Sequence, residues 1–200
     1  MSQIRQITKA IRSTLVLWIL TALIYPFLML LCGQILLPFQ ANASLITNNQ
    51  GTVIGSALIG QNFVSEKYFW SRPSTTNYST ANPQNDQAGI LKTGVSGASN
   101  LAPSNPALLK RIQGELTRLQ NVEVQPTADL IYSSGSSLDP HIIPTAAKAQ
   151  IARVAKARNI QPKQLETLIT QNTDGRFLGI FGEPGVNVLK LNLALDSLNK

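Results

Sequence analysis

The chain has 200 residues, a formal net charge of +7 at neutral pH and 44% hydrophobic residues. Three positive charges stand in the N-terminal tail, and the remaining 14 Lys and Arg face 10 Asp and Glu. Since these basic residues are dispersed and not interleaved with aromatic ones, the composition argues against nucleic-acid binding. The only cysteine, Cys32, lies in an apolar segment, so no disulfide can form within the chain.

A long apolar segment follows the basic tail. It runs from Leu15 to Phe39, and the chain carries no charged residue between Arg12 and Glu66. As a helix the segment would reach roughly 37 Å, against about 30 Å of hydrocarbon in a bilayer. Pro26, near its middle, should kink such a helix or face a neighbouring helix that satisfies the freed carbonyl. The segment is therefore predicted to span a membrane.

The charges around this segment predict its orientation. The tail holds Arg5, Lys9 and Arg12, and no acidic residue occurs among the first 65. Basic flanks stay in the cytoplasm, so the rest of the chain should lie on the far side. We therefore expect a single-pass protein of the cell (inner or plasma) membrane in three parts: a cytoplasmic N-terminal tail at 1–12, a transmembrane helix at 13–38 and an extracytoplasmic soluble domain at 39–200.

A cleaved signal peptide is the alternative interpretation of the N-terminus. Ala41-Asn42-Ala43 resembles a cleavage site of small residues, and the basic start fits the beginning of such a peptide. The apolar run, however, is well over the usual length of about 7–15 residues for the apolar part of a signal peptide. This difference in length favours a retained anchor.

The first part of the soluble domain combines one predicted strand with a long polar segment. Residues 52–60 are rich in β-branched side chains and bounded by glycine, which predicts a strand. The aromatic cluster Tyr68-Phe69-Trp70 is typical of a core, with a ligand platform as the alternative. From Ser71 to Pro106 small and polar residues dominate, and so long a structureless segment tends to be functional or ordered by a partner.

Three helices are predicted after this polar segment, each with a proline near its start. Asn105-Pro106 begins the first helix, in which leucine and isoleucine recur at helical spacing. The second begins near Pro144, and the third at Pro162. Four basic side chains of the second helix are expected to point mostly outward: Lys148, Arg153, Lys156 and Arg158.

Two further strands complete the predicted domain. Ala128–Tyr132 resembles a short strand that ends in a serine-rich loop, and leucines alternate with other residues from Leu189 to Leu195. A period of two predicts a strand, although the leucine-rich composition leaves a helix open for the last segment. Because strands and helices do not strictly alternate, we expect an α+β fold, with one N-terminal transmembrane helix followed by a single mixed α/β extracytoplasmic domain.

Candidate catalytic residues are few. His141 is the only histidine, which excludes a metal site built from several histidines, and no cluster of Asp and Glu suggests a calcium site. Asp139 and His141 stand near several serines, so an anchored extracytoplasmic hydrolase is an alternative hypothesis, as is an independent binding module. The loop Ser96–Asn100 could present backbone amides to an anion or form only a flexible turn. No catalytic residue and no metal ligand is assigned.

Eight blocks of the sequence carry a resemblance to a known family. They are the span with Tyr25-Pro26 and Gly33-Gln34, then 41–45, 55–63, 68–74, 99–101 with 104–106, 133–142 with Pro144, 150–158, and 182–184 leading to 186–196. In this order the blocks resemble the C subunits of the Kdp-type potassium-transporting P-type ATPases. The resemblance extends over nearly all of the chain, and it is the order of the blocks that makes it specific.

The resemblance implies a subunit without catalytic activity of its own. In that family a channel-like subunit, KdpA, moves potassium, and a separate subunit, KdpB, hydrolyses ATP. The resemblance implies an accessory subunit that crosses the membrane once and stabilises or assembles the complex with KdpA, KdpB and the small KdpF. It further implies a catalytic chaperone that raises the ATP affinity of KdpB.

The chaperone role of the family is connected with a Gln-Ser-Gly-Gly-Ser motif. The matching positions here are Val95–Ser99, and the chain departs from the motif at Val95 and Ala98. The resemblance implies no cofactor of the chain's own, but ATP shared with the ATPase subunit. The candidate nucleotide contacts are Ser96, Gly97, Ser99 and Asn100.

Overall fold

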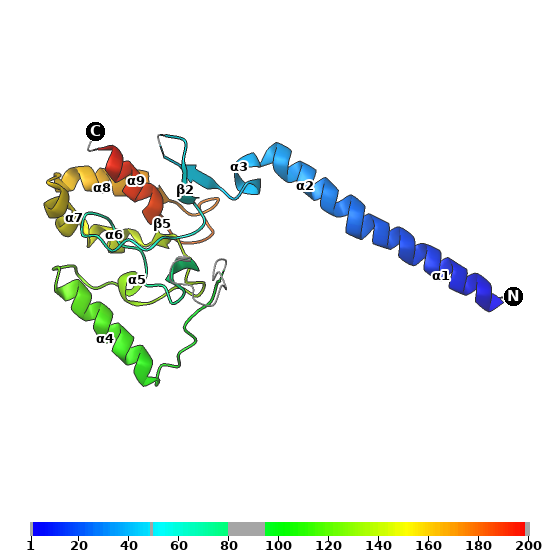
Figure 1. The fold of residues 1–200 in the computed structure, drawn as a ribbon, viewed down its shortest axis with the longest axis horizontal. Helices are drawn as coiled ribbons and strands as arrows, with labels where there is room; N and C mark the ends of the chain where they lie inside the picture. Colours follow the sequence, from blue (N-terminus) through cyan, green and yellow to red (C-terminus); the bar gives the residue numbers. More distant parts are fainter. Residues whose placement is uncertain (1, 49, 80–94, 199–200) are drawn as a thin grey trace. The chain divides into compact units, whose positions relative to one another are not determined.

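The computed structural model describes residues 2–48, 50–79 and 95–198. The chain divides into two units, Met1–Leu45 and Ile46–Lys200. The first unit is one long helical rod with a short turn of helix after it, and the second is a small domain of helices and short strands (Figure 1). The predicted fold class, one N-terminal apolar helix followed by a mixed α/β domain, is confirmed.

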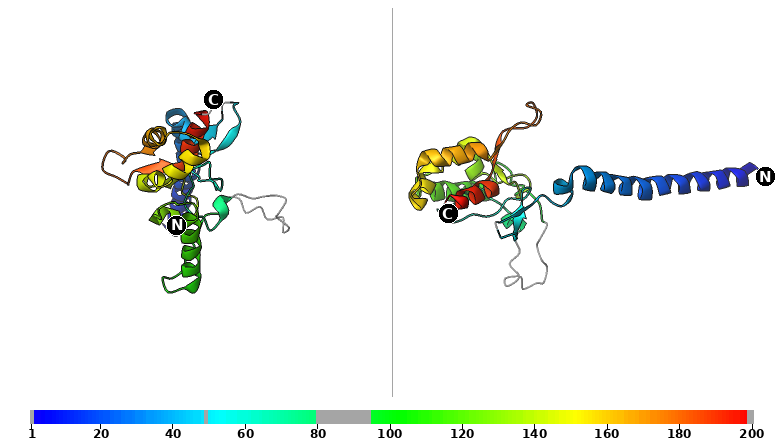
Figure 2. Two further views of the ribbon diagram at one scale, coloured as in Figure 1. Left: turned by 90° about the vertical axis from the view of Figure 1, so that its left-hand side faces the viewer. Right: turned by 90° about the horizontal axis from the view of Figure 1, so that it is seen from above.

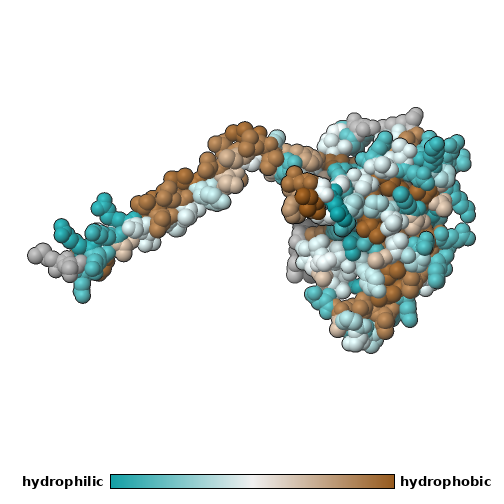
Figure 3. All heavy atoms as spheres, turned by 180° about the vertical axis from the view of Figure 1, so that it is seen from behind, coloured by the Kyte–Doolittle hydropathy of each residue, from teal (hydrophilic) through white to brown (hydrophobic). Residues whose placement is uncertain are grey.

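The rod of the first unit is built from helices α1 (Ser2–Ile19) and α2 (Tyr25–Leu36), joined by a π-helical turn η1 (Leu20–Ile24). A short helix α3 (Pro38–Ala41) follows. The stretch Gln3–Leu36, 34 residues, is long and apolar enough to cross a membrane. Its apolar side chains are exposed and cover the rod beyond a polar N-terminal end (Figure 3). Such a surface is unfavourable in water and fits lipid or other membrane helices.

The π-helical turn stands directly before Pro26. In an α-helix a proline ring clashes with the carbonyl four residues earlier, and its missing N–H leaves that carbonyl without a donor. Here the N–H of Tyr25 donates to the carbonyl oxygen of Leu20, five residues earlier, which is the π-helical pattern. The hydroxyl of Thr21 donates to the carbonyl oxygen of Leu17 at 2.8 Å. The irregularity expected at Pro26 therefore takes the form of a π turn, through which the helix continues.

The described part of the domain contains two small sheets. Strand β1 (Leu45–Thr47) pairs with β2 (Val53–Ser56), so the strand predicted at 52–60 is confirmed over the four residues of β2. The second sheet is antiparallel and has the strand order β3-β5-β4. Its strands are β3 (His141–Ile142), β4 (Thr173–Asp174) and β5 (Gly185–Asn187).

The predicted helix starts are confirmed. Proline opens α4 (Pro106–Gln120), α6 (Pro144–Lys148) and α8 (Pro162–Gln171), where a missing N–H leaves no partner unsatisfied. The side chain of Asn105 caps α4 by accepting from the N–H of Ala107 at 2.9 Å. The helix predicted from Pro144 is divided by a turn at residues 149–150, after which α7 (Ile151–Arg158) begins.

Two strand predictions differ from the structure. Ala128–Tyr132 forms a short helix, α5 (Ala128–Ile131), because Ala128 and Leu130 are good helix formers and the carboxylate of Asp129 stands in the first turn, where a negative charge stabilises a helix. The C-terminal segment forms helix α9 (Val188–Ser197), the alternative that its leucine content left open. Its buried residues stand at helical spacing, so the period of two in the leucines did not predict burial. They are Val188, Leu189, Leu191, Asn192 and Leu195.

The polar segment from Ser71 to Pro106 is described only in part, since 80–94 lie outside the described residues. In its described portion the segment holds one 3₁₀ turn, η2 (Asn77–Ser79), before α4 begins. This agrees with the predicted lack of regular structure.

The hydrophobic core lies among helices α6 to α9 and the three-stranded sheet. Helix α8 contacts both α7 and α9, and these helices lie side by side at one end of the domain (Figure 1). Helix α4 projects away from them, and Leu119 near its end is its one fully buried residue. The largest buried side chains of the core are Phe69, Leu119, Leu130, Ile142, Leu165, Ile169, Leu191 and Leu195.

Candidate functional site

The segment 66–70 lies outside the helices and strands, yet every one of its carbonyls accepts a hydrogen bond from a side chain. The donors are Arg153 for Glu66 and Tyr68, Arg158 for Lys67, Asn192 for Phe69, and Gln150 for Trp70. The side-chain oxygens of Asn192 and Gln150 also accept from the N–H groups of Phe69 at 2.9 Å and Trp70 at 2.7 Å. Two side-chain amides thus supply the bonds that a neighbouring strand would supply. We call Gln150, Arg153, Arg158 and Asn192 the clamp.

Helices α7 and α9 position the clamp. Gln150 and Arg153 stand at the start of α7 on its inner face, and Arg158 ends the same helix. Arg158 also joins the two helices, because its guanidinium lies 2.6 Å from the carboxylate of Asp196. Arg153 and Arg158 were predicted to point outward, which is wrong: Arg153 is 7% exposed, and the side chain of Arg158 is 6% exposed. A guanidinium can be buried here because it meets several main-chain carbonyls at once.

Trp70 lies between two guanidinium groups. The Cζ atoms of Arg118 and Arg153 stand 4.2 and 3.9 Å from the ring centroid, which is cation–π geometry. The indole N–H donates to the carbonyl oxygen of Ser65 at 3.0 Å. Burial, together with the positive charge of Arg118, lowers the pKa of Arg153 to about 10, so it remains charged at neutral pH. With Phe69 and Trp70 at 0% and 5% exposure, these two members of the aromatic cluster belong to the core.

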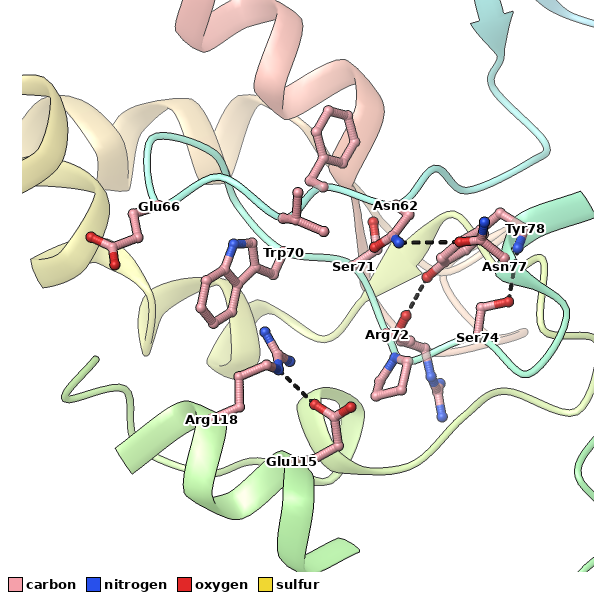
Figure 4. A pocket seen from close by; sticks show the side chains of 13 residues that line it. Asn62, Glu66, Trp70, Ser71, Arg72, Ser74, Asn77, Tyr78, Glu115 and Arg118 are labelled. Atoms are coloured by element: carbon pink, nitrogen blue, oxygen red, sulfur yellow. Dashed lines mark hydrogen bonds and ion pairs between the residues drawn. The ribbon is translucent and has the colours of Figure 1, made fainter. Parts of the chain in front are cut away.

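A cleft of about 410 Å³ opens beside Trp70 (Figure 4). Arg118 and Glu115 of α4 border it and form an ion pair at 2.7 Å. The wall opposite α4 comes from the segment that follows Phe63 and from the turn at Asn77 and Tyr78. The described residues that line the cleft include both charges and amides and form no cluster of one sign.

The predicted nucleotide loop rests on the serine-rich loop that follows α5. The N–H of Gly97 donates to the carbonyl oxygen of Ser136 at 3.0 Å, and the hydroxyl of Ser96 donates to the same oxygen at 3.2 Å. The carbonyl of Gly97 accepts from the hydroxyl of Thr75 at 3.1 Å. Ser99 is half-buried, and Asn100 is exposed with a left-handed backbone, φ 50°. The amide of Gly97 is therefore already bonded within the protein.

A cluster of charged groups lies where β3 begins. Nδ1 of His141 stands 3.7 Å from the carboxylate of Asp139, and Nε2 stands 3.1 Å from that of Asp174. Arg72 lies 3.5 Å from Asp139 and 3.3 Å from Asp129. The second oxygen of Asp129 accepts from the N–H of Ile143 at 2.7 Å. The cluster thus ties the segment after Trp70 to α5 and to the sheet.

These contacts shift two pKa values in opposite directions. The carboxylate of Asp139 is the main cause that raises the pKa of His141, and Asp174 adds to it against the effect of burial. Burial alone would raise the pKa of Asp139, but hydrogen bonds from His141 and the charge of Arg72 lower it below its ordinary value. Both residues are therefore stabilised in their charged forms.

Tyr78 and Gly60 pack directly against this cluster. Burial raises the pKa of Tyr78 to about 12, and its hydroxyl donates to the carbonyl oxygen of Arg72. A Cβ at Gly60 would stand 2.5 Å from the ring of Tyr78 and 2.7 Å from the carbonyl oxygen of Asp139. The close approach of the chain at this point requires glycine.

The whole chain matches known proteins. The family model described as "KdpC: K+-transporting ATPase, c chain" covers residues 7–197. The chain belongs to the KdpC family. Among its relatives are proteins named potassium-transporting ATPase KdpC subunit from Microcystis aeruginosa, 64% identical, and from Gloeobacter violaceus, 46% identical. A KdpC subunit 1 from Nostoc is 65% identical. The alignments cover 99%, 100% and 99% of this chain and 98%, 100% and 98% of those proteins.

Membership of the KdpC family makes the chain an accessory subunit of a potassium-transporting ATPase, and therefore part of a complex with other Kdp subunits. The one candidate spanning helix among the described residues fits a membrane-associated transport subunit. The clamp and the charged cluster lie inside the part that the family model covers.

The residues of the hydrolase hypothesis are only partly brought together. Asp139 and His141 are neighbours, but both ring nitrogens of His141 face carboxylates. The hydroxyl of Ser137 lies 2.6 Å from that of Thr75. The geometry is thus that of a charged network and not that of a serine activated by histidine.

Sequence reasoning missed the partners that come from far along the chain. Asp174 and Arg72 reach His141 and Asp139 from 33 and 67 positions away. Gln150 and Asn192 bond to main-chain groups 80 and 123 positions away. No local pattern marks such contacts; the one available signal was the presence of amide residues on otherwise apolar helix faces.

Proposed function

We propose that the chain is a non-catalytic subunit that stabilises and assembles the Kdp complex with the channel-like KdpA, the ATP-hydrolysing KdpB and the small KdpF. The observation that carries this proposal is the clamp. Its buried polar side chains Gln150, Arg153 and Asn192, which elsewhere would be candidates for chemistry, are bonded to the protein's own main chain. A domain organised in this way is suited to hold a shape against partners.

The test is recovery of the complex from membranes. Full-length chain carrying an affinity tag, expressed with all Kdp subunits, should bring down both a P-type ATPase and a polytopic channel-like subunit. In membranes from cells that lack the chain, we expect less of the assembled pump. Recovery of the chain alone, as a stable monomer, would contradict the proposal.

We also propose the orientation, with residues 1–12 in the cytoplasm, 13–38 across the membrane and 39–200 outside. In support, Arg5, Lys9 and Arg12 precede an apolar helix with no acidic residue before Glu66. In a Cys32→Ala background, a membrane-impermeant thiol reagent added to intact cells should label Lys163→Cys on α8 and leave Gln6→Cys in the tail unlabelled. The reverse pattern would contradict the orientation.

For ATP, we propose that the chain raises the affinity of KdpB for the nucleotide, with Ser96, Gly97, Ser99 and Asn100 as the contacts to test. The exposed position of Ser96 and Asn100 supports access for a ligand. A phosphate would have to replace the bond from Gly97 to Ser136, and the proposed orientation puts this loop across the membrane from cytoplasmic ATP. If the chain instead raises the ATP affinity of KdpB indirectly, through its contacts in the assembled complex, the bond of Gly97 can stay intact and the loop need not reach the cytoplasm.

Gly97→Ala separates these two routes. A Cβ at Gly97 meets no atom of the described residues within 4 Å, so we expect the substitution to leave the fold intact but to fill the space that a phosphate on the backbone would occupy. Direct contact predicts weaker ATP binding to the whole complex, and an indirect effect predicts no change. Gly114→Ala, whose Cβ likewise meets nothing within 4 Å in the part of the chain that the structure describes, is the matched control.

A further inference from the structure

Strands β4 and β5 are joined by an excursion that projects from the domain, where it stands clear of the helices (Figure 2). Its end carries four large apolar side chains that point into solvent. Phe177, Leu178, Ile180 and Phe181 are 71%, 74%, 72% and 61% exposed. We call Phe177–Phe181 the tip. Single exposed hydrophobic residues are ordinary on a protein surface, but four within five positions form a patch.

The tip has a defined backbone. Phe177 and Phe181 form an antiparallel bridge, with N–H to oxygen distances of 2.8 and 2.9 Å. Between them Leu178 and Gly179 have positive φ angles of 53° and 73°. Glycine adopts this conformation readily, whereas a leucine there is strained and is retained where the surroundings or a function require it. The hydrogen bonds thus present the apolar side chains in a fixed arrangement, which lowers the entropy lost on binding.

The charges beside the tip cancel. Arg176 and Glu183 face each other across its base, with a guanidinium nitrogen 2.9 Å from both carboxylate oxygens. Residues 177–182 between them carry no charge. Segments that dock on a membrane surface combine apolar side chains with unpaired Lys or Arg for anionic headgroups, and this tip has its one arginine neutralised. A neutral aromatic and aliphatic patch on a firm loop is instead typical of the anchor that fills a pocket on a protein partner.

We propose that the tip inserts into an apolar recess on a polytopic, membrane-embedded subunit of the same complex, on the side of the membrane where the domain lies. The inference rests on the proposed function, because it requires that the chain assembles with such a subunit. Family membership supplies the partner class, since the chain is one component of a multi-subunit transporter. The tip would be the point at which the domain is fixed to that partner.

Photo-cross-linking in native membranes tests the contact directly. With all Kdp subunits expressed, p-benzoylphenylalanine replaces Phe181 or, as the matched control, Leu58, which is 63% exposed at another place in the domain. We expect the probe at position 181 to form an adduct with the polytopic subunit and the probe at position 58 to form much less. Adducts with lipid, adducts with a second copy of the chain, or equal yields from both positions would overturn the proposal.

The double variant Phe177→Ser/Phe181→Ser measures what the contact contributes. Because loss of a buried aromatic anchor typically weakens association by a factor of ten or more, recovery of the polytopic subunit should fall at least about ten-fold. Leu58→Ser should leave recovery unchanged. The thermal unfolding of the double variant should match that of the wild type, since neither phenylalanine belongs to the core.

The outcomes distinguish this inference from the proposed function. If the wild-type chain fails to recover the pump, the proposed function itself fails. If the wild type recovers the pump and the double variant does so equally well, the chain is a Kdp subunit but the tip is not its anchor.

Discussion

Gln150 satisfies four groups with one buried amide. Its nitrogen donates to the carbonyl oxygens of Trp70 and Ala146, and its oxygen accepts from the N–H of Trp70 and the guanidinium of Arg153. The side chain is fully buried, so water cannot replace any of these bonds. An amide can fill this position because it carries both donors and acceptors on one planar group.

Gln150→Leu keeps most of the volume and removes all four bonds. The buried N–H and carbonyl of Trp70 would lose their partners, so we expect the free energy of unfolding to fall by about 2–4 kcal/mol. Gln113→Leu, at an exposed position of α4, should change it by less than about 0.5 kcal/mol. Urea unfolding of the full chain in detergent would measure both, and equal effects would contradict the role of the clamp.

His141 makes the stability of the domain depend on pH. Its pKa in the folded protein is raised above the ordinary 6.5, so its contribution is fully present below that value and is lost as pH rises through the folded pKa. Asp139, with a lowered pKa, contributes above its ordinary 3.8 and loses its contribution as pH falls through the folded pKa. The stability that this pair contributes is therefore greatest between the ordinary pKa values of Asp139 and His141, 3.8 and 6.5.

The variant His141→Gln should no longer lose stability as the pH rises above the pKa of His141, because glutamine does not titrate. We expect the wild type to be more stable at about pH 5.5 than at about pH 8.5, and the variant to show a smaller difference. The groups that face the ring are the carboxylates of Asp139 and Asp174, with Arg72 behind Asp139. If the variant showed the same difference in stability between these two pH values as the wild type, groups other than His141 would cause the pH dependence.

Among the elements, α9 shows how one repeating pattern can suggest two structures. In the helix Leu191 is fully buried while Leu193 is only half-buried, whereas a strand would place both on the same face. Asn192 lies between them, inside, where it bonds to the main chain of Phe69.

A pair of alanine substitutions distinguishes the two faces. Leu191→Ala should lower the free energy of unfolding by about 2–5 kcal/mol, because it leaves a cavity in the core. Leu193→Ala should cost about 1 kcal/mol, since less of its surface leaves water. Similar losses for both, measured by urea unfolding, would favour the strand.

The elements that could be predicted are those with local signals. Asn105-Pro106, Pro144 and Pro162 each start a helix through the chemistry of a first turn, which depends on a few adjacent residues. The strand predicted at residues 128–132 was wrong because this five-residue segment mixes helix-forming and strand-forming residues. The clamp and the contacts of His141 and Asp139 with Asp174 and Arg72 join residues far apart in the chain, so the fold must be known before they can be seen. The tip, by contrast, could have been predicted from the sequence, because its four large apolar residues stand among three closely spaced glycines.

At the scale of the whole molecule, the chain combines a helical rod and a folded domain that form separate units. The rod is not a featureless apolar cylinder. It carries a π turn before Pro26, a polar Thr21 within that turn, and Gln34, whose side chain accepts from Asn42 at 3.2 Å. Irregular backbone and polar side chains within a span are typical of helices that pack on other helices. We therefore expect the rod to be an interface as well as an anchor.

A triple substitution within the rod tests this expectation. Thr21→Leu/Pro26→Leu/Gln34→Leu keeps the span apolar, so the domain stays tethered, but removes the proline and the two polar side chains that distinguish the rod from a plain apolar helix. Polar contacts between membrane helices contribute about 0.6–2 kcal/mol each, so recovery of the pump should fall at least about three-fold.

The matched control changes three leucines of the rod, as Leu17→Ile/Leu23→Ile/Leu30→Ile, and should leave recovery unaltered. If the triple leucine variant also assembled normally, the rod would be a tether without a specific partner.

The clamp also imposes an order of events on the chain as it is made. Residues 66–70 are synthesised early, but the amides that satisfy Phe69 and Trp70 arrive 123 and 80 residues later. Once α7 has emerged, Gln150, Arg153 and Arg158 can bond to four of these residues, but Phe69 has only water or a chaperone to bond with until α9 follows. A nascent chain that ends before α9 therefore cannot close its core, and the domain gains its protease resistance only after α9 has been made.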